Sequence, residues 1–211
     1  GNPIPVPKTF KEPEKPVPAP VERTGRPYTF KERKLTASEL EYWQQYGITP
    51  EILEQYKVCS VVQFQSENAD GNPFSYSSTK EEPIYGYKNK RFIKLYRPFS
   101  KTRFLYGGNI GESYCFGLEQ LPSKGDTLFI TGGEKDVMSL AAHGFHAICF
   151  NSETVTVPPN IIYKLTFRFK HIILLYDMDA TGVESAKKHE KQLCEYGVKR
   201  LLLPLQGTKA E

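Results

Sequence analysis

The second half of the chain alternates strand-like and helix-like segments, and this alternation restricts the fold more than any other feature. Short apolar runs at 127–131, 146–150, 171–176 and 199–203 are separated by helical patterns that start near Glu134, after Pro159 and at Ala180. Such an order predicts a mainly parallel sheet with helices on its faces. The sequence therefore predicts an α/β domain over residues 125–211.

Two carboxylates directly follow the third of these strands. An apolar run at 172–175 continues through Tyr176 into Asp177, Met178 and Asp179. Residues two apart can point the same way, and ligands of open α/β sheets bind at the carboxyl ends of the strands. Two converging carboxylates repel each other unless a hard cation takes their oxygens as ligands, which favours a Mg²⁺ site. The alternative is that Asp179 only caps the helix that follows it.

The first strand of the domain also ends in glycines and acids, with Gly132 and Gly133 before Glu134 and Asp136. Glycines allow a close backbone approach to a phosphate or metal, and the next helix offers free N–H groups to an anion. This turn is a weak signal alone. Together with Asp177 and Asp179 it predicts a catalytic acidic site to which Glu134 and Asp136 also contribute.

A stretch of the first half is rich in cations and aromatic residues and contains no acid from residue 88 to residue 103. In a strand, Lys90, Phe92 and Lys94 would share one face. Cations follow phosphates and aromatic faces accept unstacked bases, as in single-strand binding grooves. The alternative is a solvated strand edge protected by lysines. The candidate nucleic-acid or nucleotide-binding residues are Lys88, Lys90, Arg91, Lys94, Arg97, Lys101 and Arg103.

The rest of the first half divides into a tail and a small folded region. Eight prolines within residues 1–27 favour extended polyproline II, so residues 1–34 are predicted to be a linker, or alternatively a ligand for an aromatic groove. Ser38 and Glu41 predict a capping box, and Thr49 before Pro50 predicts a second helix start. Alternating apolar strands follow. Residues 35–124 are thus expected to form a basic lobe, a helical hairpin with antiparallel strands.

Composition adds two exclusions. No apolar run is long enough to cross a membrane, and the first residues do not resemble a secretion signal. The four cysteines are widely spaced and form no Cys-x-x-Cys, which predicts reduced thiols in a cytoplasmic protein. The 28 Lys and Arg against 24 Asp and Glu give only a mild net charge of +4, so charge matters here only where it is clustered.

The acidic motifs together resemble the Toprim domain, the metal-binding fold of bacterial-type DNA primases, topoisomerases and some nucleases. The similarity is closest to the primase half of phage and mitochondrial primase-helicases. It is carried mainly by Asp177, Asp179 and Gly182 in the order Asp-x-Asp-x-x-Gly, and covers roughly residues 36–205. Further similarity lies in the segments 46–53, 91–98, 104–106 and 115–118.

The resemblance implies a Toprim domain, Rossmann-like with helices on both faces, preceded by a smaller α+β basic lobe. It implies a primase catalytic-core fragment that uses Mg²⁺ (or Mn²⁺) to make RNA primers on single-stranded DNA from ribonucleoside triphosphates. Asp177 and Asp179 would be metal ligands, and Lys90, Arg91, Lys94 and Arg97 would face phosphates. Expected partners are a replicative helicase and a zinc-binding domain that this chain does not supply; no membrane is expected.

The chain departs from the family pattern at one position. The leading Glu of the first Toprim motif falls on Gly132, whereas its Asp falls on Asp136. Glu134 as a metal ligand, or Glu153 in the loop after the second strand, could substitute for the missing acid. Two alternatives therefore remain, a non-catalytic single-stranded nucleic-acid-binding module and a Toprim nuclease.

Overall fold

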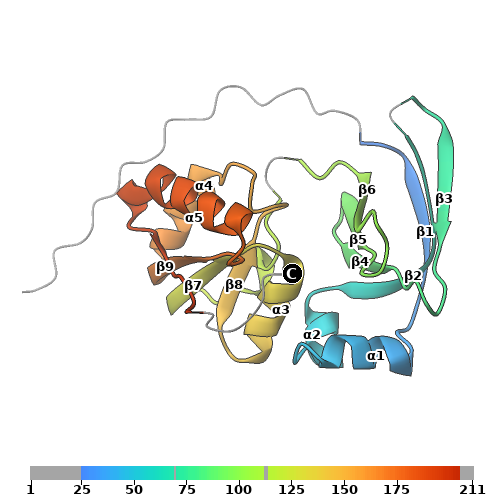
Figure 1. Ribbon diagram of the computed structural model, residues 1–211, viewed down its shortest axis with the longest axis horizontal. Helices are drawn as coiled ribbons and strands as arrows, with labels where there is room; N and C mark the ends of the chain where they lie inside the picture. The colour runs from blue at the N-terminus through green and yellow to red at the C-terminus, as the bar shows by residue number, and fades with distance from the viewer. Residues whose placement is uncertain (1–24, 69, 112–113, 205–211) are drawn as a thin grey trace, which may run out of the picture.

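The computed structural model describes residues 25–68, 70–111 and 114–204 (Figure 1). These residues form two lobes, each built on its own sheet, that lie side by side. The first lobe is antiparallel and the second is parallel, as the sequence predicts.

The sheet of the first lobe has the order β1-β2-β4-β5-β6, and β3 pairs with β2. A turn at Asn68, whose side-chain oxygen accepts hydrogen bonds from the backbone N–H groups of Asp70 and Asn72, joins β2 to β3. Neighbouring strands are antiparallel throughout. The strands are β1 (Tyr28–Arg33), β2 (Val58–Glu67), β3 (Pro73–Ser77), β4 (Tyr85–Lys88), β5 (Phe92–Tyr96) and β6 (Phe104–Gly108).

Strand β1 corrects the expected boundary of the Pro-rich linker. The prediction extended the linker to residue 34, but Tyr28–Arg33 pairs along β2. Tyr28 and Phe30 pack against the buried cluster around Phe64. These aromatic side chains favour a strand here, because burial against the sheet stabilises it. The predicted tail at 1–24 lies outside the described residues.

The helical hairpin consists of α1 (Ala37–Gln44) and α2 (Pro50–Gln55). Thr49 caps α2 and Pro50 is its first residue, as predicted. The capping box of α1 uses Thr36 and Glu39, two residues before the predicted Ser38 and Glu41. The buried Glu39 carboxylate also accepts hydrogen bonds from Arg33 and Ser60, so tertiary contacts decide where this helix begins.

The second sheet has the order β10-β9-β7-β8, and all of its strand pairs are parallel. Its strands are β7 (Gly125–Thr131), β8 (His146–Cys149), β9 (Phe169–Leu175) and β10 (Lys199–Arg200). Its helices are α3 (Glu134–Ala142), α4 (Pro159–Thr166) and α5 (Ala180–Gln192), with short 3₁₀ turns η1 (Leu118–Gln120) and η2 (Cys194–Tyr196).

Helices cover both faces of this sheet, as expected for the α/β class. Leu128, Ile130 and Ile172 pack with residues of α4 and α5, whereas Ala147 and Cys149 pack with α3. Figure 1 shows α4 and α5 on one side of the strands and α3 on the side of the first lobe. Helix α5 begins at Ala180, as predicted, and ends at Gln192, which is followed by a 3₁₀ turn and by Gly197 with φ of 71°.

The two lobes share a hydrophobic cluster. Trp43, Tyr85 and Tyr96 of the first lobe belong to the same buried group as Val137 and Met138 of α3. The aromatic side of the first lobe is therefore packed against the second lobe, which fixes the position of one sheet relative to the other.

Among the described residues, the longest helix, α5, has 13 residues, and none of the helices could cross a bilayer.

Candidate metal and nucleic-acid site

The carboxyl ends of β7 and β9 lie next to each other at a switch in strand order. The chain passes from β7 to β8 on one side and then returns to β9 on the other side of β7. Thr131 is in register with Leu175, so the turns that begin at Gly132 and Tyr176 meet at one edge of the sheet. Ligands of open α/β sheets bind at such a switch point.

The turn after β9 places Asp177 and Asp179 at this edge. Asp177 and Asp179 are both exposed, and Asp179 stands at the start of α5. One carboxylate oxygen of Asp179 accepts a hydrogen bond of 2.7 Å from the backbone N–H of Gly182 and caps α5. The capping alternative for Asp179 is thus present in the structure, but it uses only one of the two oxygens, and Asp177 has no capping role.

Gly182 makes this turn possible because its Cα lies against the backbone of Asp177. A Cβ built on Gly182 would lie 2.2 Å from the Asp177 carbonyl oxygen and 3.0 Å from its nitrogen. These are backbone atoms and cannot rotate away. Only glycine therefore fits where the Asp-x-Asp-x-x-Gly motif turns into α5.

Replacing Gly182 with Ala is expected to destabilise the protein by about 2 kcal/mol, since the added methyl group forces the Asp177 backbone to move. Urea denaturation followed by circular dichroism measures this change. A Cβ on Gly71 would have no heavy atom of the described residues within 4 Å, but its φ is 79°, so Gly71→Ala tests backbone strain without a collision among them. An equal or smaller loss for Gly182→Ala than for Gly71→Ala would contradict this account.

Two further acids, Asp136 and Glu153, complete a carboxylate cluster with Asp177 and Asp179. Burial, and next the negative charge of Asp177, raise the pKa of Asp136 to about 6. Burial, followed by the charges of Asp177, Asp179 and Asp136, also raises the pKa of Glu153. These charge effects on Asp136 and Glu153 indicate that the four side chains face a common region, to which α3, the loop after β8 and the turn after β9 each contribute.

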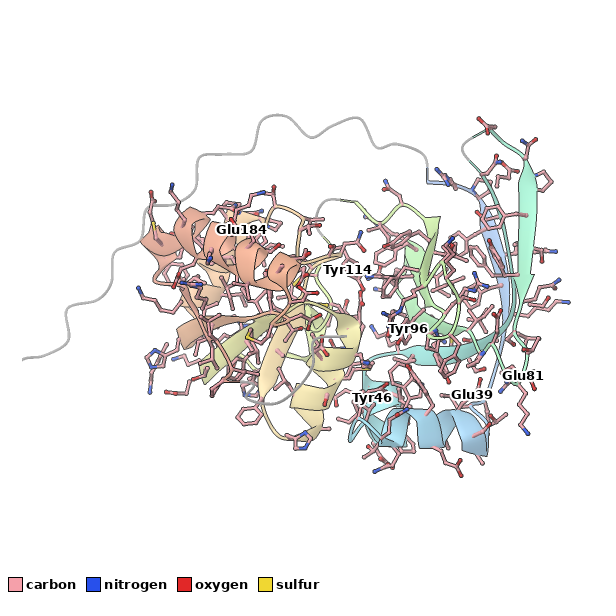
Figure 2. All side chains as sticks on the ribbon, in the orientation of Figure 1. Glu39, Tyr46, Glu81, Tyr96, Tyr114 and Glu184 are labelled. Atoms are coloured by element: carbon pink, nitrogen blue, oxygen red, sulfur yellow. The ribbon has the colours of Figure 1, made fainter. Side chains whose placement is uncertain are left out.

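Glu134 differs from its expected role. Its side chain is only 2% exposed, and one carboxylate oxygen accepts hydrogen bonds from the Lys94 ammonium at 2.6 Å and the Tyr114 hydroxyl at 2.7 Å. Figure 2 labels Tyr114 between the two lobes. Glu134 thus forms a buried ion pair between lobes, where the sequence analysis expected a metal ligand.

Lys94 was expected to face phosphates, and the structure shows that this prediction is wrong. It is 2% exposed, and besides the Glu134 pair it donates a hydrogen bond of 3.0 Å to the carbonyl oxygen of Asn151. An ammonium group held in this way cannot face a template strand. The strand pattern could not reveal this, because all of β5 is buried, by the second lobe as well as by the first.

The other predicted cations differ in how exposed they are. Lys88 pairs with Glu32 at 2.7 Å, and Arg97 lies 4.3 Å from the Tyr76 ring centre and 3.6 Å from Glu82. Both therefore have partners within the first lobe. The exposed cations are Lys90, Arg91, Lys101 and Arg103. The Arg103 guanidinium also donates a hydrogen bond to the Tyr96 hydroxyl.

Lys88 and Lys90 also line a pocket of about 500 Å³. Its other lining residues come from α2, β2, the turns next to them and η1, and include Lys57 and Glu119, which pair at 2.6 Å. None of the four clustered carboxylates lines it. This pocket therefore belongs to the basic surface and not to the acidic edge.

An aromatic surface adjoins the site and was not assigned from the sequence. Phe104 and Tyr106 on β6 are 39% and 40% exposed, and the Lys94 ammonium lies 4.7 Å from the Phe104 ring centre. Because Lys94 also reaches Glu134 and Asn151, these rings border the segments that carry the acids. The alternation Phe104-Leu105-Tyr106 was the available signal, since residues two apart share a strand face.

The donor set suits a hard divalent cation. Carboxylate oxygens are the ligands Mg²⁺ prefers, and one buried oxygen of Glu153 has no hydrogen-bond partner among the described residues. Gly132 leaves open the space next to that oxygen, since a Cβ there would lie 3.2 Å from it. Within the described ranges, no three His, Cys, Asp or Glu side chains already converge as a complete ligand set. The chemistry of these carboxylates therefore fits a divalent cation, and in this structure they are not close enough together to form a complete ligand set.

Comparison with known proteins agrees with this architecture. Residues 129–210 match the family model described as Toprim-like. No curated protein sequence matches the chain. The solved structure of the DnaG catalytic core is 18% identical with a TM-score of 0.62, over 83% of this chain and 67% of that one.

Two other solved structures are similar. The primase fragment of the bacteriophage T7 primase-helicase protein is 15% identical with a TM-score of 0.55, over 90% of this chain and 74% of that one. The DnaG primase catalytic domain bound to single-stranded DNA is 16% identical with a TM-score of 0.60, over 82% of this chain and 67% of that one. The chain therefore carries a Toprim-like domain and has the fold of DNA primase catalytic cores.

Proposed function

We propose that this chain is the catalytic core of a DNA primase, which joins ribonucleotides on a single-stranded DNA template in a Mg²⁺-dependent reaction during DNA replication. One observation carries the proposal. A cluster of carboxylates lies at the switch point of a Toprim-like sheet, and exposed aromatic rings border the same region. The similarity to a primase domain bound to single-stranded DNA supports it.

In this proposal Asp177 and Asp179 would hold the cation, and Asp136 would lie close to it. Asp179 has one carboxylate oxygen left after capping α5. Mg²⁺ bound there, or Mn²⁺ in its place, would neutralise triphosphate charge and favour attack of a 3′-hydroxyl on the α-phosphorus. The protein needs no nucleophile of its own, so its residues act by position and charge.

The first lobe would hold the template. Phe104 and Tyr106 offer faces on which unpaired bases can stack, at roughly 1–3 kcal/mol per base. The exposed cations Lys90, Arg91, Lys101 and Arg103 would follow the phosphates, and their contribution falls as salt rises. Lys94 and Arg97 act inside the protein in this account, as supports for the surface.

The proposed partners follow from the same function. They are single-stranded DNA and ribonucleoside triphosphates, together with a replicative helicase and a zinc-binding domain that would recognise the start site. The T7 neighbour is a fragment of a primase-helicase protein, which supports the helicase. The four cysteines are all free thiols, which agrees with a reducing, cytoplasmic setting.

Primer extension separates this function from its alternatives. The template is single-stranded DNA with an annealed RNA oligonucleotide, so that no start-site recognition is needed. We expect labelled ribonucleotides to be added in Mg²⁺ and not in EDTA. Tight DNA binding with no incorporation in either would identify the non-catalytic module, for which Gly132 is the specific argument. Metal-dependent shortening of the DNA would identify a nuclease.

A further inference from the structure

The Toprim-like motif after β7 has lost an acid at Gly132, and a different acid occupies the space beside it. A Cβ built on Gly132 would lie 3.2 Å from a carboxylate oxygen of Glu153 and 4.0 Å from its carboxyl carbon. A side chain at residue 132 would thus start where the Glu153 carboxylate ends. Glu153 reaches this place from the loop that follows β8, the strand paired with β7.

The surroundings of the Glu153 carboxylate favour a bound cation. The oxygen nearest Gly132 is buried and has no hydrogen-bond partner in the described part of the protein. The charges of Asp177, Asp179 and Asp136 raise the pKa of Glu153, whereas a backbone hydrogen bond from Asp177 lowers it. A buried carboxylate oxygen surrounded by acids is unfavourable unless a cation joins them.

The other candidate acid has its charge neutralised already. Glu134 is buried against Lys94, with 2.6 Å between the ammonium nitrogen and the carboxylate oxygen, and also binds the Tyr114 hydroxyl. The same ammonium donates to the Asn151 carbonyl oxygen, two residues before Glu153. Lys94 thus neutralises Glu134 and at the same time holds the loop that carries Glu153.

We propose that Glu153 supplies, from the loop after β8, the carboxylate that Gly132 lacks, and that it binds the divalent cation together with Asp177 and Asp179. This inference rests on the proposed function, whose cation it shares. It assigns the acid to a different strand connection from the one that carries it in the family motif. The glycine at 132 is then required, because a side chain there would compete with Glu153 for the same space.

Mn²⁺ binding to the whole chain tests this assignment without any activity measurement. Titration followed by electron paramagnetic resonance reports free Mn²⁺ directly. Glu153→Gln keeps the shape of the side chain and is expected to raise the Mn²⁺ dissociation constant about tenfold or more, because even residues behind metal ligands change affinity by about 10–100-fold. Glu184→Gln is the matched control, since Glu184 lies on α5 outside the carboxylate cluster and its side chain is largely exposed, and it should bind as the wild type does.

A relocation variant makes the test independent of folding defects. Glu153→Ala should lose affinity, and adding Gly132→Glu to it should restore most of the loss, since the new side chain starts beside the vacated space. Loss in Glu153→Ala with recovery in the double variant supports the proposal. Circular dichroism melts confirm that each variant is folded.

The outcomes also separate this inference from the function beneath it. If Asp177→Asn loses Mn²⁺ while Glu153→Gln and Glu153→Ala bind normally, the role of Glu153 is overturned and the metal-dependent primase survives. If the wild type binds no Mn²⁺ at millimolar concentration, the metal site itself is overturned together with the role of Glu153.

Discussion

Replacing Lys94 with Met is expected to lower the free energy of unfolding by about 3–5 kcal/mol, the usual effect of removing one partner from a buried ion pair. The substitution leaves the Glu134 carboxylate buried in the lobe interface, where the Tyr114 hydroxyl still donates to it but no cation balances its charge. It also removes the hydrogen bond to the Asn151 carbonyl oxygen. Equilibrium urea denaturation measures the change.

Two further variants show whether the buried charge is the cause. Lys88→Met breaks the Lys88–Glu32 pair, which has a similar length but is much more exposed, and should cost less than about 1 kcal/mol. Lys94→Met combined with Glu134→Leu removes both charges and should recover much of the stability. A Lys94→Met variant no less stable than Lys88→Met would show that the Lys94–Glu134 pair does not hold the lobes together.

The parallel sheet and its acidic edge could be predicted from the sequence because their signals are local. Each strand is an apolar run, and Asp177 and Asp179 follow directly on one of them. Gly182 falls at a fixed position in the same motif, and the backbone contact with Asp177 gives the physical reason. Local patterns of this kind predict the structure correctly because the local preferences of these residues agree with the tertiary fold.

The basic stretch could be predicted only in part, because burial by another lobe leaves no local mark. Lys94 has the same neighbours in sequence as an exposed strand lysine would have, yet α3 of the second lobe brings Glu134 to it. Lys90, outside β5, stays exposed. The start of α1 failed for a similar reason, since both Thr36 and Ser38 precede a Glu by three residues and contacts to Glu39 made from elsewhere select Thr36.

The sequence alone could not show whether Glu134 or Glu153 lies beside Gly132. Both were candidates for the acid missing at Gly132, and Glu134 is the nearer in sequence. In space the order is reversed, since Glu153 lies against Gly132 and Glu134 against Lys94. Neighbouring parallel strands bring their carboxyl ends together, so a residue in the loop after β8 can reach the end of β7.

Replacing Asp177 with Asn is expected to reduce ribonucleotide incorporation about 10³-fold in the primer-extension assay, which corresponds to about 4 kcal/mol in the activation free energy. Asn has nearly the same shape as Asp but no charge to hold a cation against a triphosphate. The fold should be unaffected, because Asp177 is exposed and its charge raises the pKa of both Asp136 and Glu153. Removing that charge relieves repulsion within the cluster.

Asp126→Asn is the matched control, an exposed Asp near the start of β7, at the end of the sheet opposite to Asp177. It breaks only a surface pair with Lys170 and should keep activity within about twofold of the wild type, as exposed pairs contribute little. An Asp177→Asn protein that retains activity similar to Asp126→Asn would place the chemistry away from the acidic edge. A loss confined to Asp177→Asn, with unchanged DNA affinity, would instead assign the carboxylate to the reaction and the first lobe to the template.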